Sequence, residues 1–444
     1  MAAADDEQTG TPASAPRTAL VLLTLVYVLN YLDRQILGIL SGPIQDEFHL
    51  TDTGIGLLNG PAFALTYAAL GIPIAALADR LNRRNVVAAS LAIFSAMTIL
   101  CGYALNFGQL FLARFGTGLG EAGTAPATAS ILADLYPPER RATALSFYSA
   151  GLNIGLLLGF FAGGWIAEHY GWRNAFLAAG LPGFVLAAFL LFLVDEPDRG
   201  QAENITDRSE IPSFAEVLAW LRRRRSFTWF SFGAALSSIG GYAGIAFVPM
   251  FLHDSHHLSL PAIGLVLAVF IGGAGALGTW FAGVLADRLG QLDVRWNMYV
   301  PMLGWLVSAP FLPVFFLAPN VYVAIAAGTV PAFVGAVYVG PVAAMAQAVV
   351  PARMRVRAAA IQNFITNFIG LGAAAPLVGT ISDYLKPTLG PDALRYALLA
   401  SLFTGLLGVL CYWRACRTLA ADIAAAHERD SHAVSGASAP VTPV

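Results

Sequence analysis

Four charged side chains lie deep inside apolar stretches of this 444-residue chain. Asp33 and Arg34 are neighbours in the first stretch, and Arg114 and Glu121 are seven residues apart in the fourth. A charge at the centre of a bilayer costs roughly 2.5–3.5 kcal/mol on insertion scales, so such residues usually face a partner or a watery cavity. They are therefore the residues predicted to carry the chemistry of the protein.

Helix geometry predicts that these charges form one polar path. Asp33 lies about 12 Å and Arg114 about 9 Å below the same end of their helices, at about 1.5 Å per residue. Residues seven apart share a helix face, which places Glu121 deeper, near the middle of the membrane. Burial and a nearby arginine shift a carboxyl pKa in opposite directions. We therefore expect Asp33 and Glu121 to exchange protons, with Arg34 and Arg114 as movable charge partners. A static ion-pair cluster that fixes two helices is the alternative.

The elements that position these charges are predicted to be membrane-spanning helices. The chain is 57% hydrophobic and 12% charged, with a mean hydropathy of +0.66, whereas soluble domains are about 25% charged. We expect an all-α membrane protein of twelve transmembrane helices, each with the roughly 20 residues that one crossing requires. The predicted spans are 18–41, 53–78, 85–105, 108–132, 142–166, 173–194, 226–252, 260–286, 297–317, 320–348, 357–382 and 393–416.

A long polar stretch divides the predicted helices six plus six. Residues 195–225 form a linker between a six-helix bundle at 18–194 and a second one at 226–416. The ends, 1–17 and 417–444, are rich in Ala, Ser, Thr, Pro and charge, and are predicted to be disordered tails. Arginines concentrate in the loops after the second, fourth, eighth and tenth helices. By the positive-inside rule, both tails and the linker are cytoplasmic. We expect an integral protein of a bacterial inner membrane.

Other classes of function find no support in the sequence. The net charge of −2 and the lack of a continuous basic face argue against a nucleic-acid partner. No Gly-x-x-x-x-Gly-Lys-Ser/Thr, His-Glu-x-x-His or Gly-x-Ser-x-Gly element occurs, so neither an ATP-driven pump nor an enzyme is expected. The three cysteines lack metal-ligand spacing, and we expect no metal, no cofactor and a monomer. A receptor without transport is a weaker alternative, because it leaves the four charges unexplained.

A charged loop recurs at equivalent places in the two halves. The second helix ends in Ala75-x-x-x-Asp79-Arg80-x-Asn82-Arg83-Arg84, and the eighth ends in Gly283-x-x-x-Asp287-Arg288-x-Gly290. Such a repeat is expected of a transporter built from two related halves. With this loop the chain resembles the major facilitator superfamily, whose signature after the second helix is a Gly-x-x-x-Asp-Arg-x-Gly-x-Arg loop. The resemblance implies the major facilitator fold.

The resemblance also implies a function for this loop. In the family it latches the two halves together on the cytoplasmic side when the cavity opens outward. Here Ala75 and Asn82 stand where the family pattern has glycine. The arginines are expected to bind acids such as Asp134 and Glu139. The implied gate residues are Asp79, Arg80, Arg83, Arg84, Asp287 and Arg288.

Within this superfamily the chain looks most like the spinster family. The similarity is carried by Asn30-Tyr31-Leu32-Asp33-Arg34, by Arg114-x-Gly116-x-Gly118-x-Gly120-Glu121-Ala122 and by Pro137-Pro138-Glu139-Arg140-Arg141-Ala142. The resemblance implies proton-coupled transport of a lysophospholipid or a sphingosine-1-phosphate-like amphiphile by alternating access. Organic-anion symporters of the same superfamily share the arginine and the Gly-x-Gly-Glu-Ala of the fourth helix. An organic anion is therefore the alternative substrate.

The second half contributes no deep charge, so polar side chains are its candidates for substrate contact. Those of the eleventh helix share one face, at positions i, i+3 and i+4. A cavity that is charged on one wall and mostly apolar on the other suits an amphipathic substrate, with protons and membrane lipid as the other partners. The predicted cavity residues are Asn30, Tyr31, Asn153, Tyr242, Tyr338, Asn363, Thr366 and Asn367.

The fifth helix carries a stripe of glycines. Gly151, Gly155, Gly159 and Gly163 are four residues apart, and Gly164 follows them. Glycines at this spacing let two helices approach closely. We expect the stripe to pack against the eighth helix, which is itself rich in glycine.

Overall fold

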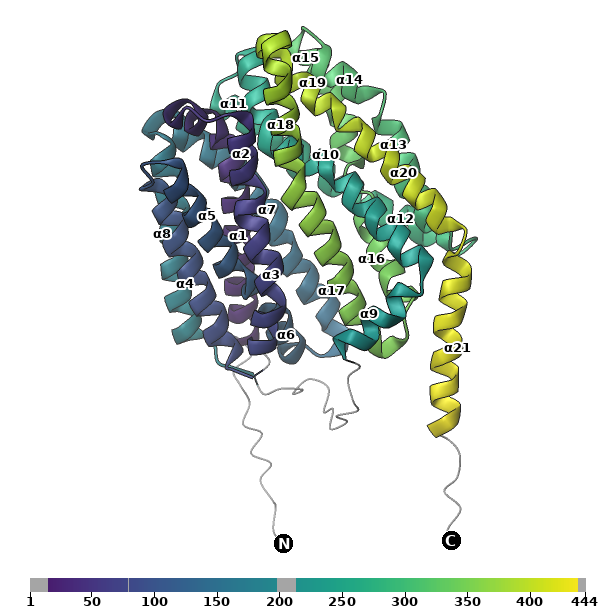
Figure 1. The fold of residues 1–444 in the computed structure, drawn as a ribbon. Helices are drawn as coiled ribbons and strands as arrows, with labels where there is room; N and C mark the ends of the chain where they lie inside the picture. Colours follow the sequence, from purple (N-terminus) through teal and green to yellow (C-terminus); the bar gives the residue numbers. More distant parts are fainter. Residues whose placement is uncertain (1–14, 79, 198–212, 438–444) are drawn as a thin grey trace, which may run out of the picture.

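The computed structural model describes residues 15–78, 80–197 and 213–437, and all of the regular secondary structure in these ranges is helical (Figure 1). The N-terminal half and the linker form nine helices, counted over the described residues. They are α1 (Ala15–Phe48), α2 (Asp52–Asn59), α3 (Pro61–Ala78), α4 (Arg83–Gly102), α5 (Phe107–Ala122), α6 (Thr124–Leu135), α7 (Pro138–Tyr170), α8 (Trp172–Leu193) and the linker helix α9 (Phe214–Arg222).

The C-terminal half contains more interruptions, including two π-helical turns. Such turns occur mostly inside α-helices and frequently at functional sites. The elements are α10 (Arg225–His256), α11 (Leu260–Leu267), the π-helix η1 (Ala268–Ala274), α12 (Gly275–Gly290), α13 (Trp296–Ser308), α14 (Phe311–Leu317), α15 (Val321–Val334), α16 (Val339–Ala348), η2 (Ala352–Met354), α17 (Arg355–Thr366), the π-helix η3 (Asn367–Leu371), α18 (Gly372–Leu389), η4 (Gly390–Asp392), α19 (Ala393–Ala400), α20 (Leu402–Cys416) and α21 (Leu419–Ala437).

The predicted all-helical membrane fold is confirmed. Within the described ranges, nine helical stretches are long and apolar enough to cross a membrane. The last of them, Ala352–Cys416, has 65 residues, far more than the roughly 20 that one crossing needs. Two further predicted spans are broken, at Gly60 between α2 and α3 and at Gly123 between α5 and α6. If this long stretch crosses the membrane twice and each broken span crosses it once, the described helices agree with twelve crossings. That number stays a prediction.

Four of the five glycines of the α7 stripe pack against α1, and the expected packing on the eighth helix holds for Gly164. A Cβ atom added at Gly155 would lie 2.5 Å from the carbonyl oxygen of Val28, and one at Gly159 would lie 2.6 Å from that of Leu32. Between these contacts the residue number rises by four on both helices, so α1 and α7 run parallel to each other. Of the stripe, Gly164 meets the second half, at the carbonyl oxygen of Leu260.

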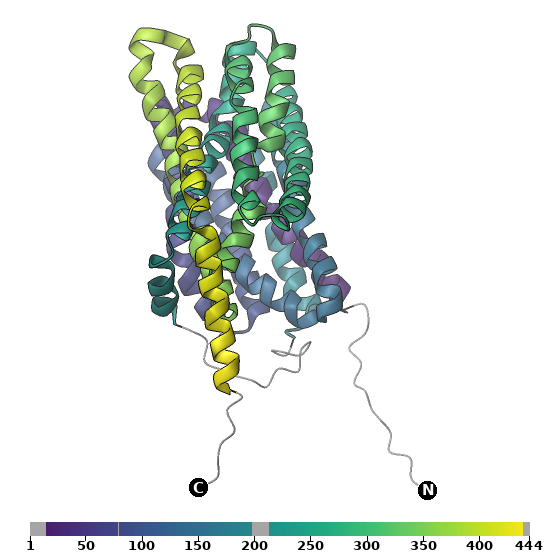
Figure 2. The ribbon, with the colours of Figure 1, turned by 90° about the vertical axis from the view of Figure 1, so that its right-hand side faces the viewer.

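The C-terminal segment from residue 417 was predicted to be disordered, and this was wrong for its first part. Helix α21 extends beyond the helical bundle (Figure 2). Asp422 anchors it, because its carboxylate accepts hydrogen bonds from the backbone N–H and hydroxyl of Ser226 at 3.0 and 2.6 Å. These bonds satisfy donors in the first turn of α10, which a purely compositional argument does not detect. The remaining predicted tail residues, 1–14 and 438–444, lie outside the described ranges.

The linker contains a helix that packs under the second half. Ser213 and Glu216 form a reciprocal capping box at the start of α9. Val217 and Leu221 are buried, and the indole N–H of Trp220 donates to the carbonyl oxygen of Val349 at 3.0 Å. We call this end of the bundle, where α6, α9 and α17 lie, the basic end; α2, α11 and α19 lie at the opposite end (Figure 1).

We predict that Gly155→Ala destabilises the protein although alanine favours helices. The added methyl group meets the Val28 carbonyl and forces α1 and α7 apart, which costs about 1–3 kcal/mol. The measurement is the thermal unfolding midpoint in detergent. Gly283→Ala is the matched control, because nothing lies within 4 Å of its added Cβ atom, and its midpoint should stay equal or rise. Equal midpoints for both variants would contradict the close packing of α1 on α7.

Candidate functional site

The four predicted charges form two ion pairs between α1 and α5. A guanidinium nitrogen of Arg114 lies 2.6 Å from a carboxylate oxygen of Asp33, whose other oxygen accepts a hydrogen bond of 3.0 Å from the hydroxyl of Thr98 on α4. Arg34 donates two hydrogen bonds to Glu121, at 3.1 and 2.6 Å. The prediction that Asp33 pairs with an arginine is thus confirmed.

The sequence spacing explains this crossed arrangement. Asp33 and Arg34 are adjacent on α1, so their side chains diverge by about 100° around the helix. Arg114 and Glu121 are two turns apart on one face of α5, so each residue of α1 meets the opposite charge at a different level. Because both pairs join the same two helices within two turns of each other, the four groups form one cluster.

The two pairs differ in their surroundings. The side chains of Asp33 and Arg114 are 1% and 3% exposed, whereas that of Arg34 is 14% exposed. The Arg34 guanidinium lies 5.1, 4.7 and 4.8 Å from the ring centres of Tyr31, Phe63 and Tyr67. Contacts of this kind stabilise a cation by about 0.5–2 kcal/mol each. The pair of Arg34 with Glu121 is held by an aromatic cage and is the more accessible of the two.

Sequence reasoning did not find the cage residues of α3. Phe63 and Tyr67 are one turn apart, and their rings stack at 5.4 Å. An aromatic pair at this spacing in an apolar helix is usually a packing feature, and only the position of Arg34 gives it another role. Two buried polar atoms nearby, Oδ1 of Asn30 and Nε of Arg114, have no hydrogen-bond partner in the described part of the chain. The cluster therefore retains unused hydrogen-bonding capacity.

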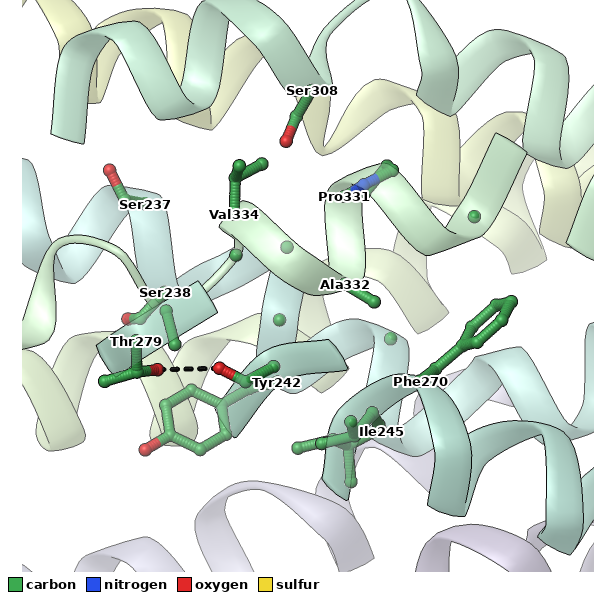
Figure 3. Close-up of a pocket in the computed structure, with 18 of the residues that line it drawn as sticks. Ser237, Ser238, Tyr242, Ile245, Phe270, Thr279, Ser308, Pro331, Ala332 and Val334 are labelled. Carbon is green, nitrogen blue, oxygen red and sulfur yellow. Dashed lines mark hydrogen bonds between the residues drawn. The ribbon is translucent and has the colours of Figure 1, made fainter. Parts of the chain in front are cut away.

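A large cavity lies mainly within the C-terminal half, against α7 of the N-terminal half. Its volume is about 740 Å³, and helices α10 to α15 supply most of its wall (Figure 3). The wall is largely apolar, with Ile245, Phe270 and Val334 among its residues, and serine and threonine hydroxyls such as those of Ser308 and Thr279 are scattered over it. Such a wall suits a hydrocarbon chain with few fixed polar contacts.

Three of the eight predicted cavity residues line this space, namely Asn153, Tyr242 and Tyr338. The wall meets α1 beside the charge cluster, because a Cβ atom added at Gly38, one turn beyond Arg34, would lie 2.4 Å from the carbonyl oxygen of Ile245, which lines the cavity. The hydroxyl of Tyr242 donates to Oδ1 of Asn367 at 3.0 Å. Asn367 thus supports the cavity wall through Tyr242.

The other predicted cavity residues lie elsewhere. Asn30 donates to the hydroxyl of Thr124 at 2.9 Å, inside the N-terminal half. Tyr31 belongs to the cage of Arg34. Thr366 accepts a hydrogen bond from Gln362 at 2.8 Å, and the backbone carbonyl of Asn363 accepts one from the amide of Asn367. The contacts of Thr366 and Asn363 lie within one helical segment, as expected of a polar face used for packing.

The predicted gate residues separate into a buried arginine and exposed charges. Arg83 is 2% exposed and contacts Asp134, as expected. It also binds Glu196 at 2.7 Å and the carbonyl oxygen of Pro197 at 2.7 Å, two partners that the sequence did not indicate. The backbone N–H of Arg84 donates to the same glutamate at 2.8 Å. Arg83 is therefore anchored within its own half.

The remaining gate residues have a different setting. Arg80, Asp287 and Arg288 are exposed at the ends of their helices. Asp79 lies outside the described residues, as does the side chain of Glu139. The predicted contact between the two halves at this loop therefore stays a prediction.

Comparisons with known proteins agree with this architecture. A family model described as Major Facilitator Superfamily matches residues 23–290 and 230–439. An MFS-type efflux pump of Mycolicibacterium smegmatis is 33% identical over 408 residues, which are 91% of this chain and 94% of that protein. The sphingosine-1-phosphate transporter SPNS2 of Mus musculus is 26% identical over 438 residues, which are 92% of this chain and 78% of that protein.

A solved structure is also similar over almost the whole chain. It is that of a bacterial homolog to the human lysosomal transporter spinster, in an inward-facing and unoccupied conformation. The TM-score is 0.85 at 27% identity, and the match covers 93% of this chain and 99% of the other. The chain belongs to the major facilitator superfamily of membrane transporters, and its similarity to spinster proteins extends over almost its whole length.

Proposed function

We propose that this protein is a proton-coupled secondary transporter that moves an amphipathic, single-chain lipid by alternating access. One observation carries the proposal. A buried charge cluster lies in the N-terminal half, and a mostly apolar cavity lies mainly in the C-terminal half. The two meet where α1 crosses α10, because Gly38, one turn beyond Arg34, closely approaches the carbonyl oxygen of Ile245, a residue of the cavity wall. A change of charge in the cluster can thus act on the wall of the space in which a substrate can be held.

The charge cluster supports proton coupling. Breaking one buried ion pair typically costs about 3–5 kcal/mol, because a charge is left without compensation. Protonation neutralises the carboxylate and removes its share of that cost, so proton binding and separation of the pair favour each other. Glu121 with Arg34 is the pair best placed to open, since Arg34 is partly exposed and the aromatic cage can hold its cation. Asp33 has a second donor in Thr98 and is held more firmly.

The cavity supports a lipid-like substrate of lysolipid or sphingolipid type. Its volume of about 740 Å³ lies within the roughly 300–1,000 Å³ range of small-molecule sites. Trp280 lines the cavity and is 69% exposed, which favours entry from the side between helices. The similarity to the sphingosine-1-phosphate transporter SPNS2 of Mus musculus agrees with this class of substrate.

The proposed setting is a bacterial inner membrane with the basic end in the cytoplasm. Arg83, Arg84, Arg222 and Arg223 lie at this end, together with the start of α1 and with α21. Positive residues near helix ends favour the cytoplasmic side. Both chain ends are then cytoplasmic, and the protein is proposed to act as a monomer.

The first functional prediction concerns the acids. Glu121→Gln removes the charge and mimics the protonated carboxyl group, so the variant should bind substrate but lose most of the pH dependence of transport. Asp33→Asn should bias the resting conformation, and Arg114→Ala should be the most damaging, because it leaves buried acids without a counter-charge. Flux in proteoliposomes, with and without a proton gradient, measures these effects.

Asp46→Asn is the matched control for these variants, because Asp46 is an exposed acid of the same helix. Its transport should keep the wild-type pH profile. If Asp33→Asn and Glu121→Gln, separately and together, also keep that profile, the coupling mechanism is wrong.

The second functional prediction concerns the cavity. Gly241 lines it, and nothing lies within 4 Å of a Cβ atom added there, so Gly241→Leu should fit and occupy part of the space. Excluding two or three chain methylenes, at about 0.8 kcal/mol each, should weaken lysolipid competition about tenfold or more. Gly283→Leu is the control, since Gly283 has equal space but lies outside the cavity.

The binding assay also separates the two substrate classes. Arg34 is the most exposed of the four charges, which favours an anionic substrate group. If small carboxylic acids compete for the site and lysolipids do not, the protein is instead an organic-anion and proton symporter. Equal lysolipid affinity in the wild type and Gly241→Leu would remove the cavity from the mechanism.

A further inference from the structure

The two halves meet at two helix crossings at the opposite end of the bundle from the basic end. In one, α2 of the first half crosses α18 of the second; in the other, α11 of the second half crosses α7 of the first. These are the second and eleventh, and the eighth and fifth, predicted helices. The second helix of the first half corresponds to the eighth, and the fifth corresponds to the eleventh. The two crossings are therefore formed by equivalent pairs of helices.

At the first crossing, a carboxylate of one half binds the start of a helix in the other. The backbone N–H groups of Asp52 and Thr53, the first two residues of α2, donate to Asp383 at 3.0 and 2.9 Å. The Thr53 hydroxyl adds a bond of 2.6 Å. The first N–H groups of a helix lack partners within the helix and carry partial positive charge, so a carboxylate there is stabilising.

Asp52 is held across the same crossing from two further directions. Its carboxylate accepts a hydrogen bond of 2.6 Å from the hydroxyl of Ser382 and lies 3.0 Å from the ammonium group of Lys386, both on α18. Asp52 is 2% exposed. Separation of α2 from α18 would therefore break several charge-assisted hydrogen bonds at once.

The second crossing repeats this arrangement. The backbone N–H of Leu260, the first residue of α11, faces the carboxylate of Glu168 on α7 at 3.4 Å. One turn earlier on α7 is Gly164, where an added Cβ atom would lie 2.6 Å from the Leu260 carbonyl oxygen. At the first crossing, Gly379 is likewise one turn before Asp383, and its added Cβ atom would lie 2.4 Å from the Asp52 carbonyl oxygen.

A second glycine completes each crossing at the same spacing. Gly56 is four residues after Asp52, and its added Cβ atom would lie 2.5 Å from the carbonyl oxygen of Ala375. Gly264 is four residues after Leu260, and its added Cβ atom would lie 2.4 Å from that of Phe160. Ala375 and Phe160 are each four residues before the glycine of their own helix. The match in spacing extends over four helices.

We propose that these two crossings are equivalent latches that hold the transporter closed at this end, with Asp383 and Glu168 as the latch carboxylates. The glycines let the backbones come close enough for each carboxylate to reach the start of the opposing helix. Opening this end requires both carboxylates to leave those helix starts. The inference concerns the conformational equilibrium itself and rests on the proposed function only in assuming alternating access.

The geometry makes the two latches unequal. Asp383 accepts three hydrogen bonds of 2.6–3.0 Å from α2, whereas the contact of Glu168 with α11 is 3.4 Å long. Charge-assisted hydrogen bonds contribute about 1.5–3 kcal/mol each and weaken with distance. Asp383 is therefore the dominant latch.

The test measures distances between spin labels without substrate or proton gradient. Labels on Leu105 and Tyr322, which are 75% and 79% exposed on the two halves at this end, report its opening. Asp383→Ala should raise the population with the longer distance about tenfold or more, and Glu168→Gln should raise it less. Labels on Phe192 and Val356, towards the basic end, should show the reciprocal shortening. The three native cysteines are buried, which favours selective labelling.

Two further variants keep the test decisive. Gly379→Ala retains Asp383 but forces α18 away from α2, so it should open the same end. Asp392→Ala is the control, because Asp392 pairs with Arg395 of its own half, and it should leave both distances unchanged. An unaltered distribution for a folded Asp383→Ala variant would overturn the proposal. Because no transport is measured, this failure is distinct from a failure of proton coupling or lipid binding.

Discussion

The burial of four charges between α1 and α5 constrains the N-terminal half. An unpaired ion in an apolar interior is so unfavourable that both helices must keep the register in which each charge meets its opposite. The back of α1 is fixed by a different requirement, since the glycines of α7 let the backbone carbonyls of Val28 and Leu32 come into contact. Helix α1 is thus held by polar contacts on one side and by close packing on the other.

The two halves share a backbone plan but divide the chemistry. Equivalent glycine and carboxylate contacts join them at the end away from the basic loops. The buried charges belong to the first half, whereas most of the cavity wall belongs to the second. The repeat therefore preserves the contacts between the two halves, whereas the side chains inside each half differ.

Sequence reasoning predicted what depends on position along a single helix. Equal depth predicted the pairing of Asp33 with an arginine, and helix-end charges predicted the contact of Arg83 with Asp134. It did not assign Arg34 to Glu121, because the rotation of α1 against α5 depends on packing with α3, α4 and α7. The same limitation explains why α1 was missed as the partner of four of the five α7 glycines, since a smooth stripe fits any close neighbour. The C-terminal helix was missed because its stability comes from Asp422 contacting the distant Ser226.

The position of Gly38 suggests how the proposed proton site and the latches act on one equilibrium. Gly38 is one turn beyond Arg34 on α1, and a Cβ atom added there would lie 2.4 Å from the carbonyl oxygen of Ile245 on α10. Helix α1 therefore touches the second half one turn from the ion pair of Arg34 with Glu121. Opening of that pair in the proposed cycle would remove one of the two ion pairs between α1 and α5 while this contact still binds α1 to α10. Any resulting rotation of α1 reaches the second half without passing through the latches. The latch contacts oppose separation of the closed end. They therefore set how much free energy proton binding must supply before that end opens.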